Sequence, residues 1–152
     1  MKHFFLLTLL LLLSTSASAD KMAMLSDAPK SYDTECASCH MAYPPGVLGQ
    51  KNWQNIMSGL DKHFGTDASL DSKTQTEITQ WLLKNAATRQ KYSALAPENR
   101  ATQSAWFIRE HREISAEVWT RDSIKSRSNC MACHVDAIKG IFNDDNVRIP
   151  KK

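Results

Sequence analysis

Large aliphatic and aromatic side chains are scarce outside the first nineteen residues of this 152-residue chain. Without those nineteen, leucine, isoleucine, valine and phenylalanine make up 22 of 133 residues. A share below about 20% favours disorder only when the net charge is also high, and here 18 basic residues nearly balance 16 acidic ones. The composition therefore excludes a large sheet enzyme with an aliphatic core. It indicates that a bulky apolar group other than these side chains fills the interior.

The sequence also lacks the motifs of several large functional classes. It has no Gly-rich phosphate loop, no G-x-S-x-G turn and no H-E-x-x-H pair, which are typical of nucleotide-binding proteins, serine hydrolases and zinc proteases. No basic patch dominates, so a nucleic-acid partner is not expected. No apolar run after Ala19 reaches the roughly 20 residues that a membrane helix needs, so the mature chain is expected to have no membrane span.

The first nineteen residues have the three parts of a secretory signal peptide. Lys2 precedes an almost unbroken apolar run from Phe4 to Leu13, and small residues end the segment at Ala17-Ser18-Ala19. The run is too short for an uncleaved membrane anchor. The pattern predicts cleavage after Ala19 and a periplasmic protein that is soluble once residues 1–19 are removed.

The four cysteines form two copies of one motif. The copies are Cys36-Ala37-Ser38-Cys39-His40 and Cys130-Met131-Ala132-Cys133-His134. C-x-x-C-H is the attachment signature of c-type haem. Cysteines three apart lie on one face of a helical turn, where each can form a thioether bond to one vinyl group of the same porphyrin, and the next histidine reaches the iron. The sequence predicts two covalently bound haem c groups, held by Cys36 and Cys39 and by Cys130 and Cys133.

Three other uses of paired cysteines are less consistent with the sequence. A zinc ribbon also has two C-x-x-C pairs, but about 15–20 residues separate them, whereas Cys39 and Cys130 are far apart. Disulfides suit an oxidising compartment, and a thioredoxin-like motif needs a βαβ context. None of the three requires a histidine after the second cysteine.

The number of histidines matches the number of axial positions on two haem irons. The mature chain has four, namely His40, His63, His111 and His134. His40 and His134 are proximal ligands by motif, which leaves His63 and His111 as candidate distal ligands of haem 1 and haem 2. The crossed pairing stays open at this point. Methionine is the rival ligand type, and Met57 is the rival residue in the central part of the chain.

The apolar pattern predicts a mainly α protein with much irregular structure. Residues 20–35 are expected to be extended, one helix is expected around residues 53–60, and a second is expected from about residue 72 to 89. Ser128 or Asn129 is a candidate N-cap before the second motif, and the tail after Gly140 is expected to be a loop. Pro97 marks a boundary between an N-terminal haem c domain (20–96) and a C-terminal one (97–152).

Three segments resemble the bacterial dihaem cytochrome c family. They are CASCHMAYPP at residues 36–45, IMSGLDKHFG at 56–65 and WFIREHRE at 106–113, together with the late C-x-x-C-H motif. The resemblance implies two small haem-bearing halves, the first like a class I cytochrome c, with low-potential bis-His haems. It also implies electron exchange with other redox proteins, among them a small high-spin cytochrome c and membrane cytochromes b.

Filled axial positions predict an electron carrier that is not an enzyme. Neither iron would be open to oxygen, peroxide or nitrite, so outer-sphere electron transfer is the expected function. The alternative is a dihaem peroxidase or small-oxyanion reductase with one open haem site, and a haem-based sensor or gas carrier has the same requirement.

Overall fold

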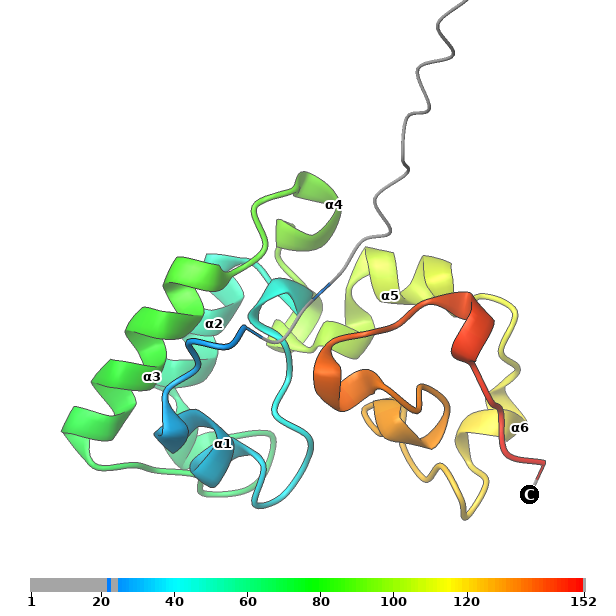
Figure 1. Ribbon diagram of the computed structural model, residues 1–152, viewed down its shortest axis with the longest axis horizontal. Helices are drawn as coiled ribbons and strands as arrows, with labels where there is room; N and C mark the ends of the chain where they lie inside the picture. The colour runs from blue at the N-terminus through cyan, green and yellow to red at the C-terminus, as the bar shows by residue number, and fades with distance from the viewer. Residues whose placement is uncertain (1–21, 23–24, 152) are drawn as a thin grey trace, which may run out of the picture.

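The computed structural model describes residue 22 and residues 25–151. The predicted export signal and its cleavage site after Ala19 lie outside the described residues. Figure 1 shows two lobes. One carries α1, α2 and α3, the other carries α5, α6 and the C-terminal segment, and α4 lies between them along the chain.

The described residues form short helices joined by irregular segments. The α-helices are α1 (Lys30–Cys36), α2 (Gln50–Ser58), α3 (Ser72–Asn85), α4 (Gln90–Ser93), α5 (Ala105–Glu110) and α6 (Ala116–Trp119). Short 3₁₀ turns lie at Pro45–Val47, Leu60–Lys62, Pro97–Asn99, Ala101–Gln103, Cys130–Ala132, Ala137–Lys139 and Asp144–Asn146. In this part of the chain β-structure is limited to isolated bridges. The predicted fold class, mainly α with much irregular structure, is confirmed.

The α2–α3 pair provides the core of the first lobe. Ile78 and Leu82 on α3 are almost completely buried, and Trp53 on α2 packs in the same cluster. Asp71 caps α3 by accepting hydrogen bonds from the backbone N–H groups of Lys73 and Thr74 at 3.0 and 3.1 Å, which satisfies donors that have no partner within the helix. The apolar spacing predicted this helix correctly, although it ends at Asn85 rather than near Arg89.

Residues 30–36 contradict the predicted extended leader. They form α1, whose Tyr32 is buried with its ring centroid 4.7 Å from that of Trp81. A single buried ring gives no apolar stripe along seven residues, so periodicity could not reveal this helix.

Asn129 occupies the N-cap position before the second motif, as predicted. The motif begins in a 3₁₀ turn at Cys130, and the Asn129 side chain makes no capping hydrogen bond to it. The Asn129 amide donates instead to the carbonyl of Ile124 at 3.0 Å. The tail after Gly140 is irregular as predicted, apart from the turn at Asp144–Asn146.

Polar contacts of the described residues join the two lobes directly and through α4. The Trp106 indole donates to the carbonyl of Val47 at 3.2 Å. Lys91 on α4 lies 3.4 Å from the Glu110 carboxylate on α5. The hydroxyl of Tyr43 donates to the carbonyl of Ser128 at 2.7 Å. None of the helices in the described part of the chain is long and apolar enough to cross a membrane.

Gly49 lies where the chain before α2 meets α4. A Cβ atom at this position would lie 2.4 Å from the carbonyl oxygen of Ser93, whereas one at Gly59 would come no closer than 3.5 Å to the nearest atom. Gly49→Ala should therefore lower the free energy of unfolding by about 1–3 kcal/mol, the range typical of overpacking. Chemical denaturation of the holoprotein measures this change.

Gly59→Ala is the matched control, because it adds the same methyl group without a clash. It should leave stability unchanged or raise it by a few tenths of a kcal/mol, since alanine restricts the unfolded chain. Equal effects of the two substitutions would contradict the proposed close approach at Gly49.

Candidate haem sites

The first C-x-x-C-H motif lies at the end of a helix. Cys36 is the last residue of α1, and Cys39 and His40 follow in an exposed turn. His63 comes directly after the 3₁₀ turn Leu60–Lys62, and its backbone pairs with Thr66 in an isolated bridge. The fold therefore brings together two histidines that the sequence singled out as ligands of one haem.

His40 and His63 face each other at a distance suited to an intervening metal. Their ring centroids are 6.1 Å apart and their planes are inclined by 23°. The Nδ1 atom of His40 lies 2.7 Å from the carbonyl oxygen of Met41. Because a carbonyl only accepts, Nδ1 carries the proton and Nε2 keeps its lone pair for a metal.

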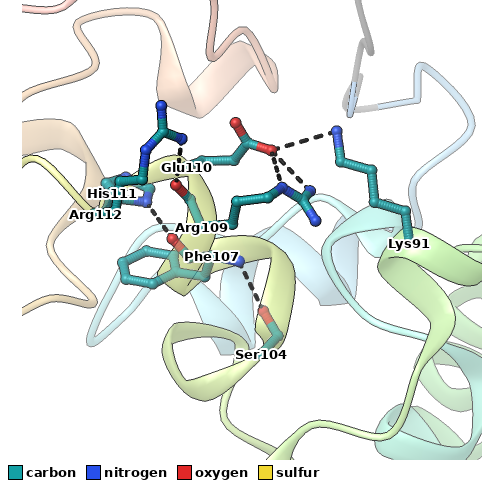
Figure 2. A network of polar contacts seen from close by, with 7 residues as sticks. All are labelled: Lys91, Ser104, Phe107, Arg109, Glu110, His111 and Arg112. Atoms are coloured by element: carbon teal, nitrogen blue, oxygen red, sulfur yellow. Dashed lines mark hydrogen bonds and ion pairs between the residues drawn. The ribbon is translucent and has the colours of Figure 1, made fainter.

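His111 and His134 form a second pair with the same spacing. His111 is the C-cap of α5, and His134 follows the 3₁₀ turn Cys130–Ala132. Their ring centroids are also 6.1 Å apart, but the planes are inclined by 79°. The Nδ1 of His111 donates to the carbonyl of Phe107 at 2.9 Å, as Figure 2 shows, which again leaves Nε2 for a metal.

Aromatic rings fix the orientation of the second pair. The Phe107 ring stacks on His111 with centroids 4.0 Å apart. Trp119 lies 5.7 Å from His111, and Phe142 lies 5.4 Å from His134. The sequence placed an aromatic cluster before His111 but assigned no role to Trp119 or Phe142. The spacing of four residues from Phe107 to His111 was the available signal.

The charged residues around His111 form bonds and ion pairs with other polar groups. Figure 2 shows the Glu110 carboxylate bonded to Arg109 and paired with Lys91. These side chains are exposed, whereas His111 is half-buried. The charged run is therefore a solvated face, and the histidine within it faces the interior.

Burial keeps the half-buried imidazoles neutral. Desolvation lowers the pKa of His63, and the nearby His40 and Arg100 lower it further. Desolvation and His111 lower the pKa of His134, against an opposing effect of Asp144. Both rings are thus in the neutral form that binds metals.

No disulfide joins the four cysteines of the described residues, so the disulfide alternative has no support. Burial raises the pKa of the Cys36 and Cys130 thiols to about 11 in each case. Within the described residues, no three His, Cys, Asp or Glu side chains gather into a metal site, so a four-ligand zinc site has no support either.

Two facing imidazoles match the needs of a haem iron. The porphyrin supplies four nitrogens, so the protein has to supply only the two axial ligands. A metal–imidazole bond is about 2.0–2.1 Å, as for zinc, and the ring centre lies about 1.2 Å beyond the nitrogen, so two rings on one metal would have centroids about 6.4–6.6 Å apart. Both observed spacings of 6.1 Å are slightly shorter than this value.

A partly open cavity lies against the second lobe, and Tyr43, Val47 and residues of α4 also line it. Its volume is about 1000 Å³, at the upper end of the range of about 300–1,000 Å³ for cofactor sites. Its lining includes both second-motif cysteines, both histidines and several apolar rings, namely Cys130, Cys133, His111, His134, Trp119 and Phe142. The residues present therefore fit a flat apolar group attached to Cys130 and Cys133.

The predicted rival ligand lies elsewhere. Met57 is 4% exposed and belongs to the core between α2 and α3. His63, six residues later, is the residue that faces His40.

Comparisons with known proteins agree with this geometry. The family model for dihaem cytochrome c matches residues 32–142. A diheme cytochrome type c from Shewanella baltica is 39% identical over 80% of this chain and 93% of its own, with a TM-score of 0.71. One from Rhodobacter sphaeroides is 38% identical over 78% of this chain and 100% of its own, with a TM-score of 0.66. A search of curated proteins finds no significant match.

Both C-x-x-C-H motifs lie within the matched residues, and the histidine of each belongs to one of the two histidine pairs. The chain belongs to the dihaem cytochrome c family and carries two covalently attached haem c groups.

Proposed function

We propose that the protein is an electron carrier with two low-potential bis-His haems, ligated by His40 and His63 and by His111 and His134. The observation that carries the proposal is the pairing of each motif histidine with a second histidine at 6.1 Å. When bound, each haem supplies a one-electron redox couple.

The histidine pairs account for outer-sphere transfer in preference to catalysis. With haem bound, His63 and His111 would each fill the position that a small substrate would need. The Nδ1 of His111 donates to the Phe107 carbonyl, which leaves its Nε2 as the donor to a metal. Two imidazoles favour a lower potential than imidazole with methionine. The enzyme alternative needs one of these two histidines to be absent from its iron, and no contact in the described residues favours that arrangement.

The cysteines attach the haems within two units of the chain. Cys36 and Cys39 serve the haem of the N-terminal unit (20–96), and Cys130 and Cys133 serve that of the C-terminal unit (97–152). The signal sequence supports export to the periplasm, where the partners would be other redox proteins, such as a small high-spin cytochrome c or a membrane cytochrome b.

The two haems should give different low-spin ferric EPR signals. Nearly parallel imidazoles, as in the His40–His63 pair at 23°, interact with the same iron d orbital and produce a rhombic signal. Nearly perpendicular imidazoles, as in the His111–His134 pair at 79°, interact with two different d orbitals and produce a strongly anisotropic signal. The oxidised holoprotein should show both signals in equal amounts.

Replacing each distal histidine should remove one signal. His63→Ala should convert the rhombic signal, and His111→Ala the anisotropic one, to a high-spin signal from an iron that binds carbon monoxide when reduced. Met57→Leu, which nearly conserves volume, is the control and should change neither signal. Loss of the opposite signal would show that the pairs are crossed, and an unchanged spectrum would remove that histidine from the ligand set.

Arg100 should raise the potential of the first haem. Its guanidinium lies 4.3 Å from the Phe64 ring centroid, and that ring lies 4.8 Å from the centroid of His63. A positive charge about 10 Å from a redox centre stabilises the reduced form by on the order of 0.4–1.7 kcal/mol. For one electron this is about 20–70 mV, and the Glu98 carboxylate 3.2 Å from Arg100 offsets part of it.

Arg100→Gln should therefore lower the potential of the haem with the rhombic signal by a few tens of millivolts in a spectroelectrochemical titration. Lys84→Gln removes the same charge from an exposed position on α3 and should shift neither haem. A shift confined to the other haem would contradict the placement of Arg100 beside the first.

A further inference from the structure

Tyr43 contacts both haem sites. It follows His40 by three residues, and its ring centroid lies 5.0 Å from that of His40. Its hydroxyl donates a 2.7 Å hydrogen bond to the carbonyl of Ser128, two residues before Cys130. Tyr43 also lines the cavity of the second lobe together with Cys130 and His134. One side chain thus extends from a ligand of the first haem to the attachment segment of the second.

The position of Tyr43 is fixed on the side of the first lobe. The buried hydroxyl of Tyr32 donates a hydrogen bond to the Tyr43 carbonyl. Pro44 follows and restricts the backbone of the residue before it to extended conformations. The ring also packs against the first-lobe core. The Tyr43 hydroxyl extends beyond these contacts and donates its hydrogen bond to Ser128 in the second lobe.

We propose that Tyr43 is a positioning residue that holds the attachment segment of the second haem against the proximal histidine of the first, and thereby sets the rate of electron exchange between the haems. The proposal rests on the proposed electron-transfer function. It adds a residue that binds neither iron and forms no thioether.

The other contacts between the lobes have a different location. The Trp106–Val47 hydrogen bond and the Lys91–Glu110 ion pair join the first lobe and α4 to α5. Neither involves a residue of either C-x-x-C-H motif or the segment just before Cys130. Since electron tunnelling slows steeply with separation, the contact that links the two motif regions is the one expected to control exchange.

The test is the rate of intramolecular exchange in half-reduced holoprotein. Exchange broadening of the haem methyl resonances in NMR spectra measures this rate, and a dilution series removes exchange between molecules. Tyr43→Phe keeps the ring but loses the bond to Ser128, so exchange should slow several-fold while both haems stay low-spin. Tyr43→Leu also loses the ring and should slow exchange further.

Asn55→Ala is the matched control. It removes the 3.0 Å hydrogen bond that the Asn55 amide donates to the Asn99 side chain, a contact between the N-terminal and C-terminal units that involves neither C-x-x-C-H motif and lies outside the cavity lining. This variant should exchange at the parent rate. Measuring both haem potentials in each variant separates a change in rate from a change in driving force.

Exchange at the parent rate in Tyr43→Phe overturns the proposal, even if Tyr43→Leu is slow, because the hydroxyl would then have no positioning role. Equal slowing by Asn55→Ala, or slowing explained by altered potentials, overturns it as well. Failure of the proposed function would be seen separately, as a high-spin haem in the parent protein.

Discussion

The rest of the structure depends on holding two imidazole rings with their centroids 6.1 Å apart, at two places in the chain. In each pair one ring belongs to a C-x-x-C-H motif and the other comes from a turn 23 residues away, with the motif first in one pair and last in the other. Because the same number of residues separates the two histidines in each pair, we attribute the difference between the two ring angles to the residues that contact each ring. His40 is held by its own neighbouring carbonyl, whereas Phe107 both accepts from His111 and stacks on it.

The two lobes satisfy this constraint with different interiors. The first has a core of its own, in which Ile78, Leu82 and Trp53 pack between α2 and α3. In the second, Phe107, Ile124 and Ala137 are the buried apolar residues among those described, and Phe107 also lines a partly open cavity of about 1000 Å³. The scarcity of aliphatic residues follows from this arrangement, since haem supplies apolar surface that side chains supply in other small domains.

Local chemistry made part of this account predictable from the sequence. C-x-x-C-H specifies its cofactor because thioether attachment and axial ligation both depend on residues within one turn. The second helix was predictable because Ile78, Trp81 and Leu82 recur at helical spacing after the cap at Asp71. The partners of His40 and His134 could be inferred because the mature chain has as many histidines as two haem irons have axial positions. Their ligation stays a prediction that the facing rings support.

What could not be predicted depends on tertiary contacts. Helix α1 has one buried ring and so no periodic pattern, and the turn geometry of the second motif depends on Ile124, which accepts from Asn129. The contact from Tyr43 to Ser128 joins residues 85 apart in sequence. No propensity encodes such a pairing, because it exists only after both lobes have formed.

Iron X-ray absorption of the oxidised holoprotein tests the central claim most directly, since it counts the atoms bound to iron without altering the protein. The account predicts six nitrogen neighbours per iron at about 2.0 Å, averaged over both haems, and no bound sulfur. A sulfur neighbour would show that methionine replaces a histidine, and an average coordination below six would show an open site. Either result would contradict bis-His ligation at both haems.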